Sequence, residues 1–126
     1  MKKVLVIDDD IDLVEAVTNL LESRNYRVVS ANDGDEGFAL ALKEKPDLML
    51  LDVMMTDKTE GFSVARKIQD NEETKNIPII MVTGIRKDMN LPFSIQPDNE
   101  WLPVKCILEK PVKPEVLLKA VSENIK

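Results

Sequence analysis

Short, uninterrupted apolar runs recur along the chain, and they constrain its fold more than any other feature. Four consecutive apolar residues, three of them β-branched, make up Val4–Ile7. Similar runs occur in Leu48–Leu51 and Ile77–Val82. Strands of a parallel sheet have this composition because helices cover both faces of the sheet. Two further strands are predicted over Tyr26–Ala31 and Val104–Leu108.

Segments with apolar residues at helical spacing separate the predicted strands. The first, Ile11–Arg24, carries one apolar stripe, which consists of Ile11, Val14, Val17, Leu20 and Leu21. Three more helices are predicted over Glu36–Lys45, Phe62–Asp70 and Pro114–Ile125. Because strands and helices alternate from end to end, the sequence predicts an α/β domain whose doubly wound parallel sheet is covered on both faces.

The stretch Ile85–Pro103 departs from this alternation. It contains three prolines and no sustained helical stripe, so we expect an irregular segment in place of a regular fourth helix. Trp101, the sole tryptophan, lies within it and is expected to cover the sheet edge or core, with contact to a partner as the alternative. Cys106, in the last predicted strand, is expected to be a small core residue.

Length, charge and composition narrow the possible functions. A chain of 126 residues can bury one core, so we expect a single domain over residues 1–126 without an attached effector domain. The net charge of -6 disfavours direct binding to nucleic acid, and no apolar run is long enough to cross a membrane. The absence of histidine excludes histidine-based catalysis. A single cysteine cannot form an internal disulfide, which fits a cytoplasmic location.

Polar residues follow four of the predicted strands. They are Asp8, Asp9 and Asp10 after the first strand, Asp52 after the third, Thr83 after the fourth and Lys110 after the fifth. The carboxyl ends of parallel strands meet at one edge of the sheet, where ligands bind. Because adjacent carboxylates repel each other, the three acids indicate a hard cation such as Mg²⁺, with helix capping as the alternative.

Together these side chains suit phosphoryl transfer. The cation and Lys110 would neutralise phosphoryl oxygens, and Thr83 would donate a hydrogen bond to one of them. One carboxylate could then act as the nucleophile and become an acyl phosphate.

Four segments resemble the receiver domain of bacterial two-component response regulators. They are Val4–Asp10, Pro46–Met55, Ile79–Gly84 and Glu109–Pro114. The resemblance spans nearly the whole chain and implies a flavodoxin-like (βα)₅ fold with five parallel strands in the order 2-1-3-4-5. It also implies a stand-alone phosphoacceptor that uses Mg²⁺, takes its phosphoryl group from a sensor histidine kinase or a phosphotransfer protein, and acts on a downstream protein.

The resemblance also implies roles for single residues at the acidic site. Asp52 would be the phosphoacceptor. Asp9 would bind Mg²⁺ directly and Asp8 mainly through water, while Asp52 and the backbone carbonyl of Met54 would complete the protein ligands. Asp10 is left with the capping role at the start of the first helix.

The remaining motif positions include both matches and departures. Thr83 and Lys110 match the switch hydroxyl and the phosphate-contacting lysine of the family, and the peptide bond before Pro111 is expected to be cis. Thr56 stands where the family usually has proline. Ile107 replaces the usual switching aromatic residue, so rotation of an aromatic ring cannot be the output.

Two alternative functions remain open from the sequence. The first is a receiver fold that acts as an interaction module without phosphorylation, which the intact set of site residues disfavours. The second is a phosphatase of the haloacid dehalogenase type, with Asp8 as nucleophile and Asp10 as the second acid of its Asp-x-Asp motif. That alternative leaves Asp52 without a role, and no acidic pair follows the fourth strand.

Overall fold

The computed structural model describes residues 1–52, 60–83, 106–109 and 112–125. Over these residues the chain forms a five-stranded sheet in the order β2-β1-β3-β4-β5. All neighbouring strands are parallel. The strands are β1 (Lys3–Ile7), β2 (Arg27–Ala31), β3 (Leu48–Asp52), β4 (Ile79–Thr83) and β5 (Cys106–Glu109). The predicted parallel sheet and its strand order are confirmed.

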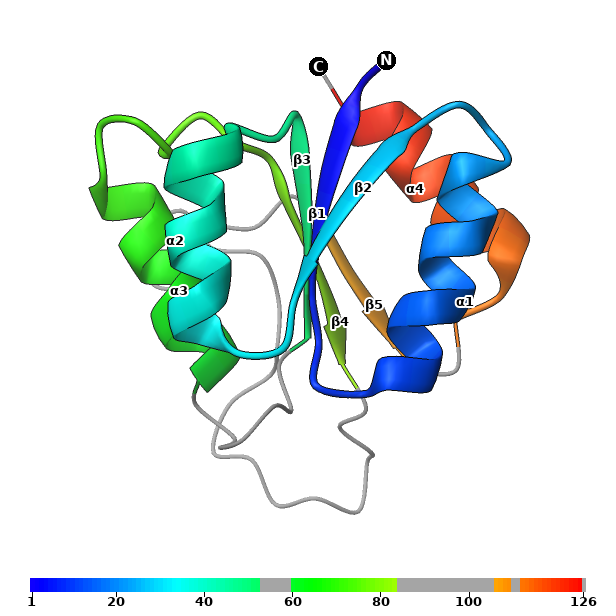
Figure 1. Cartoon of the computed structure of the whole chain (residues 1–126), viewed down its shortest axis with the longest axis horizontal. Helices are drawn as coiled ribbons and strands as arrows, with labels where there is room; N and C mark the ends of the chain where they lie inside the picture. Colours follow the sequence, from blue (N-terminus) through cyan, green and yellow to red (C-terminus); the bar gives the residue numbers. More distant parts are fainter. Residues whose placement is uncertain (53–59, 84–105, 110–111, 126) are drawn as a thin grey trace.

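Helices cover both faces of this sheet (Figure 1). On one face lie α1 (Ile11–Glu22) and α4 (Pro114–Asn124), and on the other lie α2 (Gly34–Glu44) and α3 (Glu60–Asp70). None of the helices in the described part of the chain combines the length and the apolar character that crossing a bilayer requires. The predicted irregular segment Ile85–Pro103, with Trp101, lies outside the described residues.

Several predicted boundaries shift by about two residues. The second helix begins at Gly34 rather than Glu36, because the carboxylate of Asp33 caps it by accepting the Glu36 N–H at 2.8 Å. The first helix ends at Glu22 rather than Arg24, and Asn25 follows it in the left-handed region with a φ of 68°.

The other boundary corrections concern α3 and β4. The third helix begins at Glu60 rather than Phe62. The fourth strand begins at Ile79 rather than Ile77, because Pro78 has no N–H for the ladder, although its carbonyl accepts the Met49 N–H at 2.9 Å.

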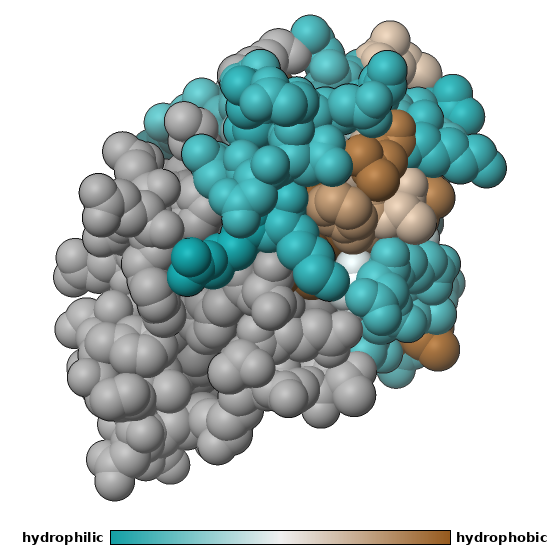
Figure 2. All heavy atoms as spheres, turned by 90° about the vertical axis from the view of Figure 1, so that its left-hand side faces the viewer, coloured by the Kyte–Doolittle hydropathy of each residue, from teal (hydrophilic) through white to brown (hydrophobic). Residues whose placement is uncertain are grey.

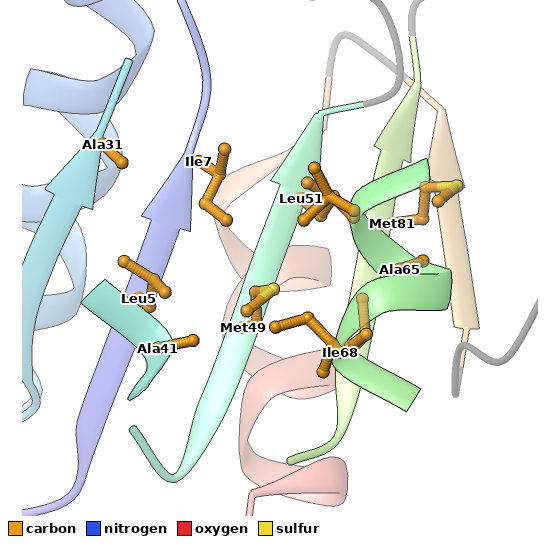
Figure 3. Packing of buried hydrophobic residues seen from close by; sticks show 11 residues of the cluster. Leu5, Ile7, Ala31, Ala41, Met49, Leu51, Ala65, Ile68 and Met81 are labelled. Carbon is orange, nitrogen blue, oxygen red and sulfur yellow. The ribbon is translucent and has the colours of Figure 1, made fainter. Parts of the chain in front are cut away.

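The core consists of two layers, one on each face of the sheet. Alternate strand residues enter each layer, as the period of a strand requires. Figure 3 shows the layer beneath α2 and α3, in which Ala41, Ala65 and Ile68 from the helices lie against Leu5 and Met49 from the strands. The layer beneath α1 and α4 includes Val4, Val6, Leu21, Leu48, Leu50, Ile80, Leu117 and Val121.

Each helix buries one face against the sheet and exposes the other to solvent. On the side that carries α2 and α3, the described residues present a mostly hydrophilic surface, with most of the hydrophobic atoms gathered in one area (Figure 2). Ile11, the first member of the predicted apolar stripe, does not pack into the core, because the residue is 70% exposed. Ile11 is the first residue of α1, and this end of the helix lies at the edge of the sheet (Figure 1).

Candidate functional site

The register of β1 and β3 brings two acids side by side at the carboxyl edge of the sheet. Ile7 pairs with Leu51, so Asp8 and Asp52 occupy equivalent positions one residue further along. Side chains alternate along a strand, and Ile7 and Leu51 both enter the layer beneath α2 and α3. Asp8 and Asp52 therefore share the opposite face.

Three carboxylates meet at this point. Oxygen atoms of Asp8, Asp9 and Asp52 all lie within 4.8 Å of one another. Asp8 and Asp52 are buried, with 4% and 3% of their surfaces exposed, whereas Asp9 is exposed. Two buried acids and one exposed acid at this distance repel one another when all are ionised, which favours a bound cation. The three residues predicted to hold Mg²⁺ with their side chains are thus adjacent.

Asp8 is held by the chain just after it and by the adjoining strand. Its N–H donates to the carbonyl of Ala31 at 3.1 Å, which continues the contact between β1 and β2 beyond Ile7. Its Oδ1 accepts the N–H of Asp10 at 2.9 Å. These contacts restrain both the backbone and the carboxylate of Asp8.

Asp10 has a different role from its two neighbours. Its Oδ1 accepts the Leu13 N–H at 3.2 Å, and its carbonyl accepts the Val14 N–H at 3.0 Å. Asp10 is therefore the N-cap of α1, as predicted, and Asp12 lies within the first turn.

The remaining predicted site residues lie at the same edge of the sheet or outside the described residues. Thr83 ends β4, one residue beyond Val82, which pairs with Asp52. Thr83 itself pairs with Glu109, the last residue of β5 and the one before Lys110. The described part of the chain does not include Met54, Thr56, Lys110 or Pro111. The side chains of Thr83, Cys106 and Ile107 also fall outside it.

The donor set suits Mg²⁺. Magnesium prefers oxygen ligands at about 2.0–2.1 Å in octahedral geometry, so two oxygens on opposite sides of the ion lie about 4.2 Å apart. The oxygen atoms of Asp8, Asp9 and Asp52 lie within 4.8 Å of one another, so one ion could contact all three after small side-chain adjustments. Carboxylates alone, without histidine or thiolate, favour Mg²⁺ over zinc.

Sequence reasoning missed the groups that support the acids. The backbone N–H of Asp10 and the carbonyl of Ala31 hold Asp8, and backbone groups leave no residue-type signal in a sequence. Gly37 was also missed, although a glycine inside a predicted helix is a signal of close packing. A Cβ at Gly37 would overlap the Ile7 side chain, which precedes Asp8.

Comparisons with known proteins agree with this geometry. Residues 4–122 match the family described as the response regulator receiver domain. The chain belongs to this family. Protein PilH of Pseudomonas aeruginosa is 34% identical over 125 residues, which cover 97% of this chain and 96% of PilH.

Two further relatives extend the comparison. The solved structure of the chemotaxis protein CheY4 of Vibrio cholerae is 30% identical, covers 99% of both chains and superposes with a TM-score of 0.81. The phosphate regulon transcriptional regulatory protein PhoB of Pseudomonas aeruginosa is 35% identical over 89 residues. Those residues are 71% of this chain and 35% of PhoB, so the match spans about a third of that longer protein.

Family membership establishes the general function. The chain is a receiver domain of two-component signal transduction, and it acts as a phosphoacceptor. Receiver domains bind Mg²⁺ at an acidic pocket and are phosphorylated by histidine kinases or phosphotransfer proteins. They are signal transducers rather than enzymes that act on a separate substrate. The dehalogenase-type alternative has no support, since the carboxylate of Asp10 caps α1.

Proposed function

We propose that Asp52 is the residue that accepts the phosphoryl group and that phosphorylation changes which protein the receiver binds. The observation that carries this proposal is the meeting of Asp52, buried at the end of β3, with Asp8 and Asp9. Asp9 and Asp52 would bind Mg²⁺ directly, Asp8 mainly through water, and the backbone carbonyl of Met54 would complete the protein ligands.

The chemistry of the proposed step is a substitution at phosphorus. A carboxylate oxygen of Asp52 attacks the phosphorus of a phosphohistidine on the donor protein, forming an O–P bond while the N–P bond breaks and histidine leaves. Bound Mg²⁺ supplies charge neutralisation at the phosphoryl oxygens. Lys110 would contact the same oxygens, and Thr83 would donate a hydrogen bond to one of them.

The phosphorylated state is proposed to be transient. A water molecule that attacks the phosphorus of the acyl phosphate would release phosphate and regenerate the Asp52 carboxylate. While the group remains, the added charge would draw Thr83 toward it and bias an existing equilibrium between two conformations.

The proposal also covers the setting of the protein. The family match over residues 4–122 and the near-complete match with PilH support residues 1–126 acting as one receiver domain. A cytoplasmic location is supported by a single cysteine, which cannot form an internal disulfide. Fractionation of cells that express a tagged chain would test the location.

Phosphorylation with a small donor tests the assignment of Asp52. The full chain is incubated with Mg²⁺ and acetyl phosphate, and its intact mass is measured. The wild type should gain one phosphoryl group, whereas Asp52→Asn should gain none because an amide oxygen is a poor nucleophile. Asp33→Asn is the matched control, because it neutralises a capping aspartate and should be phosphorylated like the wild type.

Two outcomes would contradict the proposal. Modification that persists in Asp52→Asn would show that another residue accepts the group. No modification of the wild type by acetyl phosphate, and no binding of beryllofluoride, would favour the receiver fold acting as an interaction module without phosphorylation.

A further inference from the structure

We propose that Asp10 is a positioning residue for the Mg²⁺ site: by capping α1, its side chain fixes the backbone N–H that holds the carboxylate of Asp8. The inference rests on the proposed function, because it concerns the same metal site. It gives Asp10 a role in metal binding although its own carboxylate lies outside the group formed by Asp8, Asp9 and Asp52.

The first step of the argument is the contact between Asp10 and Asp8. The Asp10 N–H donates to Asp8 Oδ1 at 2.9 Å, a good hydrogen-bond distance for a charge-assisted bond. This bond fixes the rotation of the Asp8 carboxylate. Groups that surround a metal site without touching the ion commonly contribute to metal affinity, and Asp10 would do so through Asp8, which is proposed to hold Mg²⁺ mainly through water.

The second step is the contact between Asp10 and α1. Asp10 has an extended backbone, with φ −87° and ψ 101°, and its Oδ1 accepts the Leu13 N–H. This hydrogen bond fixes the backbone of Asp10 relative to the first turn of α1. The N–H that faces Asp8 and the side chain that holds Leu13 belong to one residue, so fixing one fixes the other.

The third step is the weakness of other contacts at this helix end. Ile11 is 70% exposed and Asp12 is exposed, so the first residues of α1 gain little from burial. An N-terminal turn without burial depends on its cap to stay ordered. On the strand side, by contrast, Asp8 is already tied to Ala31. The cap of Asp10 therefore orders the N–H that contacts Asp8 at a helix end that burial does little to hold.

Substitutions at Asp10 separate the cap from the charge. Asn keeps a side-chain oxygen acceptor and removes the charge, whereas Ala removes both. Mg²⁺ affinity of the full chain is measured by isothermal titration calorimetry at fixed ionic strength. Asp10→Ala should bind Mg²⁺ about tenfold more weakly than the wild type. Asp10→Asn should stay within about twofold, which is rescue by the residue that retains the cap.

A matched control removes the equivalent cap from another helix. Asp33 caps α2 through the Glu36 N–H at 2.8 Å. Asp33→Ala should lower the melting temperature as Asp10→Ala does, yet leave the Mg²⁺ affinity within about twofold of the wild type. A purely structural role for Asp10 would give the same result for both alanine variants.

The outcomes distinguish this inference from the proposed function. If the wild type does not bind Mg²⁺, or Asp9→Asn binds it equally well, the proposed metal site itself fails. If the wild type binds, Asp9→Asn does not, and Asp10→Ala retains full affinity, only the role of Asp10 is overturned. Equal losses in Asp10→Asn and Asp10→Ala would also overturn it, because charge would then explain both.

A second variant protects the test against misfolding. Asp10→Gly lacks a side-chain acceptor but costs a helix start much less stability than alanine does. If Asp10→Ala does not fold, Asp10→Gly should show the same weakening of Mg²⁺ binding. Wild-type affinity in Asp10→Gly would overturn the proposal.

Discussion

At the scale of single residues, Gly37 determines how closely α2 approaches β1. It is buried in the helix, and a Cβ at this position would overlap Cδ1 of Ile7, which is itself fully buried. Overpacking of this kind costs about 1–3 kcal/mol, while Ala gains up to about 1 kcal/mol in helix propensity. We therefore expect Gly37→Ala to lower the free energy of unfolding by up to about 2 kcal/mol, as measured by urea denaturation.

A double-mutant cycle checks the cause of this loss. Ile7→Val removes Cδ1, so the double variant Gly37→Ala with Ile7→Val should be more stable than the two separate losses would predict. Strictly additive losses would contradict the overlap as the cause. Because Ile7 directly precedes Asp8, the Mg²⁺ affinity of the same variants would show whether strain at Ile7 affects the proposed metal site.

Residue-type signals predicted the acids but not the groups that orient them. Asp8, Asp9 and Asp52 could be grouped from the sequence because each follows a predicted strand of the same parallel sheet. Ile11 was misplaced because helical spacing identifies an apolar stripe but not where the helix extends past its neighbours. Backbone donors such as the Asp10 N–H depend on local dihedral angles, which a list of residues does not specify.

At the scale of elements, one ion pair links the first strand to the end of α2. Lys3 Nζ donates to Glu44 Oε1 at 3.1 Å and to the Glu44 carbonyl at 3.2 Å. The hydrogen bond and the charge of Lys3 lower the pKa of Glu44 below its usual value of 4.5. A lowered folded-state pKa stabilises the protein above the unfolded-state value, and the stabilisation disappears as the pH falls through the folded-state value.

The pH dependence of Glu44→Gln follows from this sign. At about pH 7 the variant should be slightly less stable than the wild type, and the difference should shrink as the pH falls below 4.5, as measured by urea denaturation. Glu72→Gln is the matched control, because it removes an exposed pair with Lys75 and should change little at either pH. A difference that grows toward low pH would contradict the role of Lys3.

The sequence predicted whether a segment is a helix or a strand wherever the spacing of apolar residues was clear. It did not predict where each helix or strand begins and ends. Each apolar run that predicted a strand contains the observed strand or overlaps it, because burial on both faces demands continuous apolar sequence. The start of α2 was placed too late because Asp33 and Gly34 have the composition of a turn, whereas Asp33 serves as a cap. An aspartate is common both in turns and at helix N-caps, and only the hydrogen bond from the Glu36 N–H shows that Asp33 is a cap.

At the scale of the whole molecule, strand order brings together residues that are distant in the chain. β3 lies beside β1, so Asp52 reaches Asp8 and Asp9 across forty or more positions of sequence. The sequence could predict that all strand ends share one edge. It could not by itself predict which strands are neighbours, and the resemblance to the receiver family supplied that order.

If the three carboxylates bind Mg²⁺ as proposed, the stability of the whole domain should depend on Mg²⁺. A ligand that binds only the folded state, at a concentration about 100-fold above its Kd, adds about 2.7 kcal/mol to the free energy of unfolding. For a domain of this size that should raise the melting temperature by about 10 °C. Calorimetry of the full chain with and without Mg²⁺ measures the shift, and Asp9→Asn should lose most of it.

Screening of the net charge of -6 could also raise the melting temperature, so NaCl at matched ionic strength is the necessary control. Screening acts on all exposed charges, whereas a bound ion acts on the three carboxylates that lie within 4.8 Å of one another. An equal shift with NaCl, or a full shift in Asp9→Asn, would contradict a specific site. A shift in melting temperature that requires both Mg²⁺ and Asp9 would show that the residues proposed for phosphoryl transfer also stabilise the fold when they bind the ion.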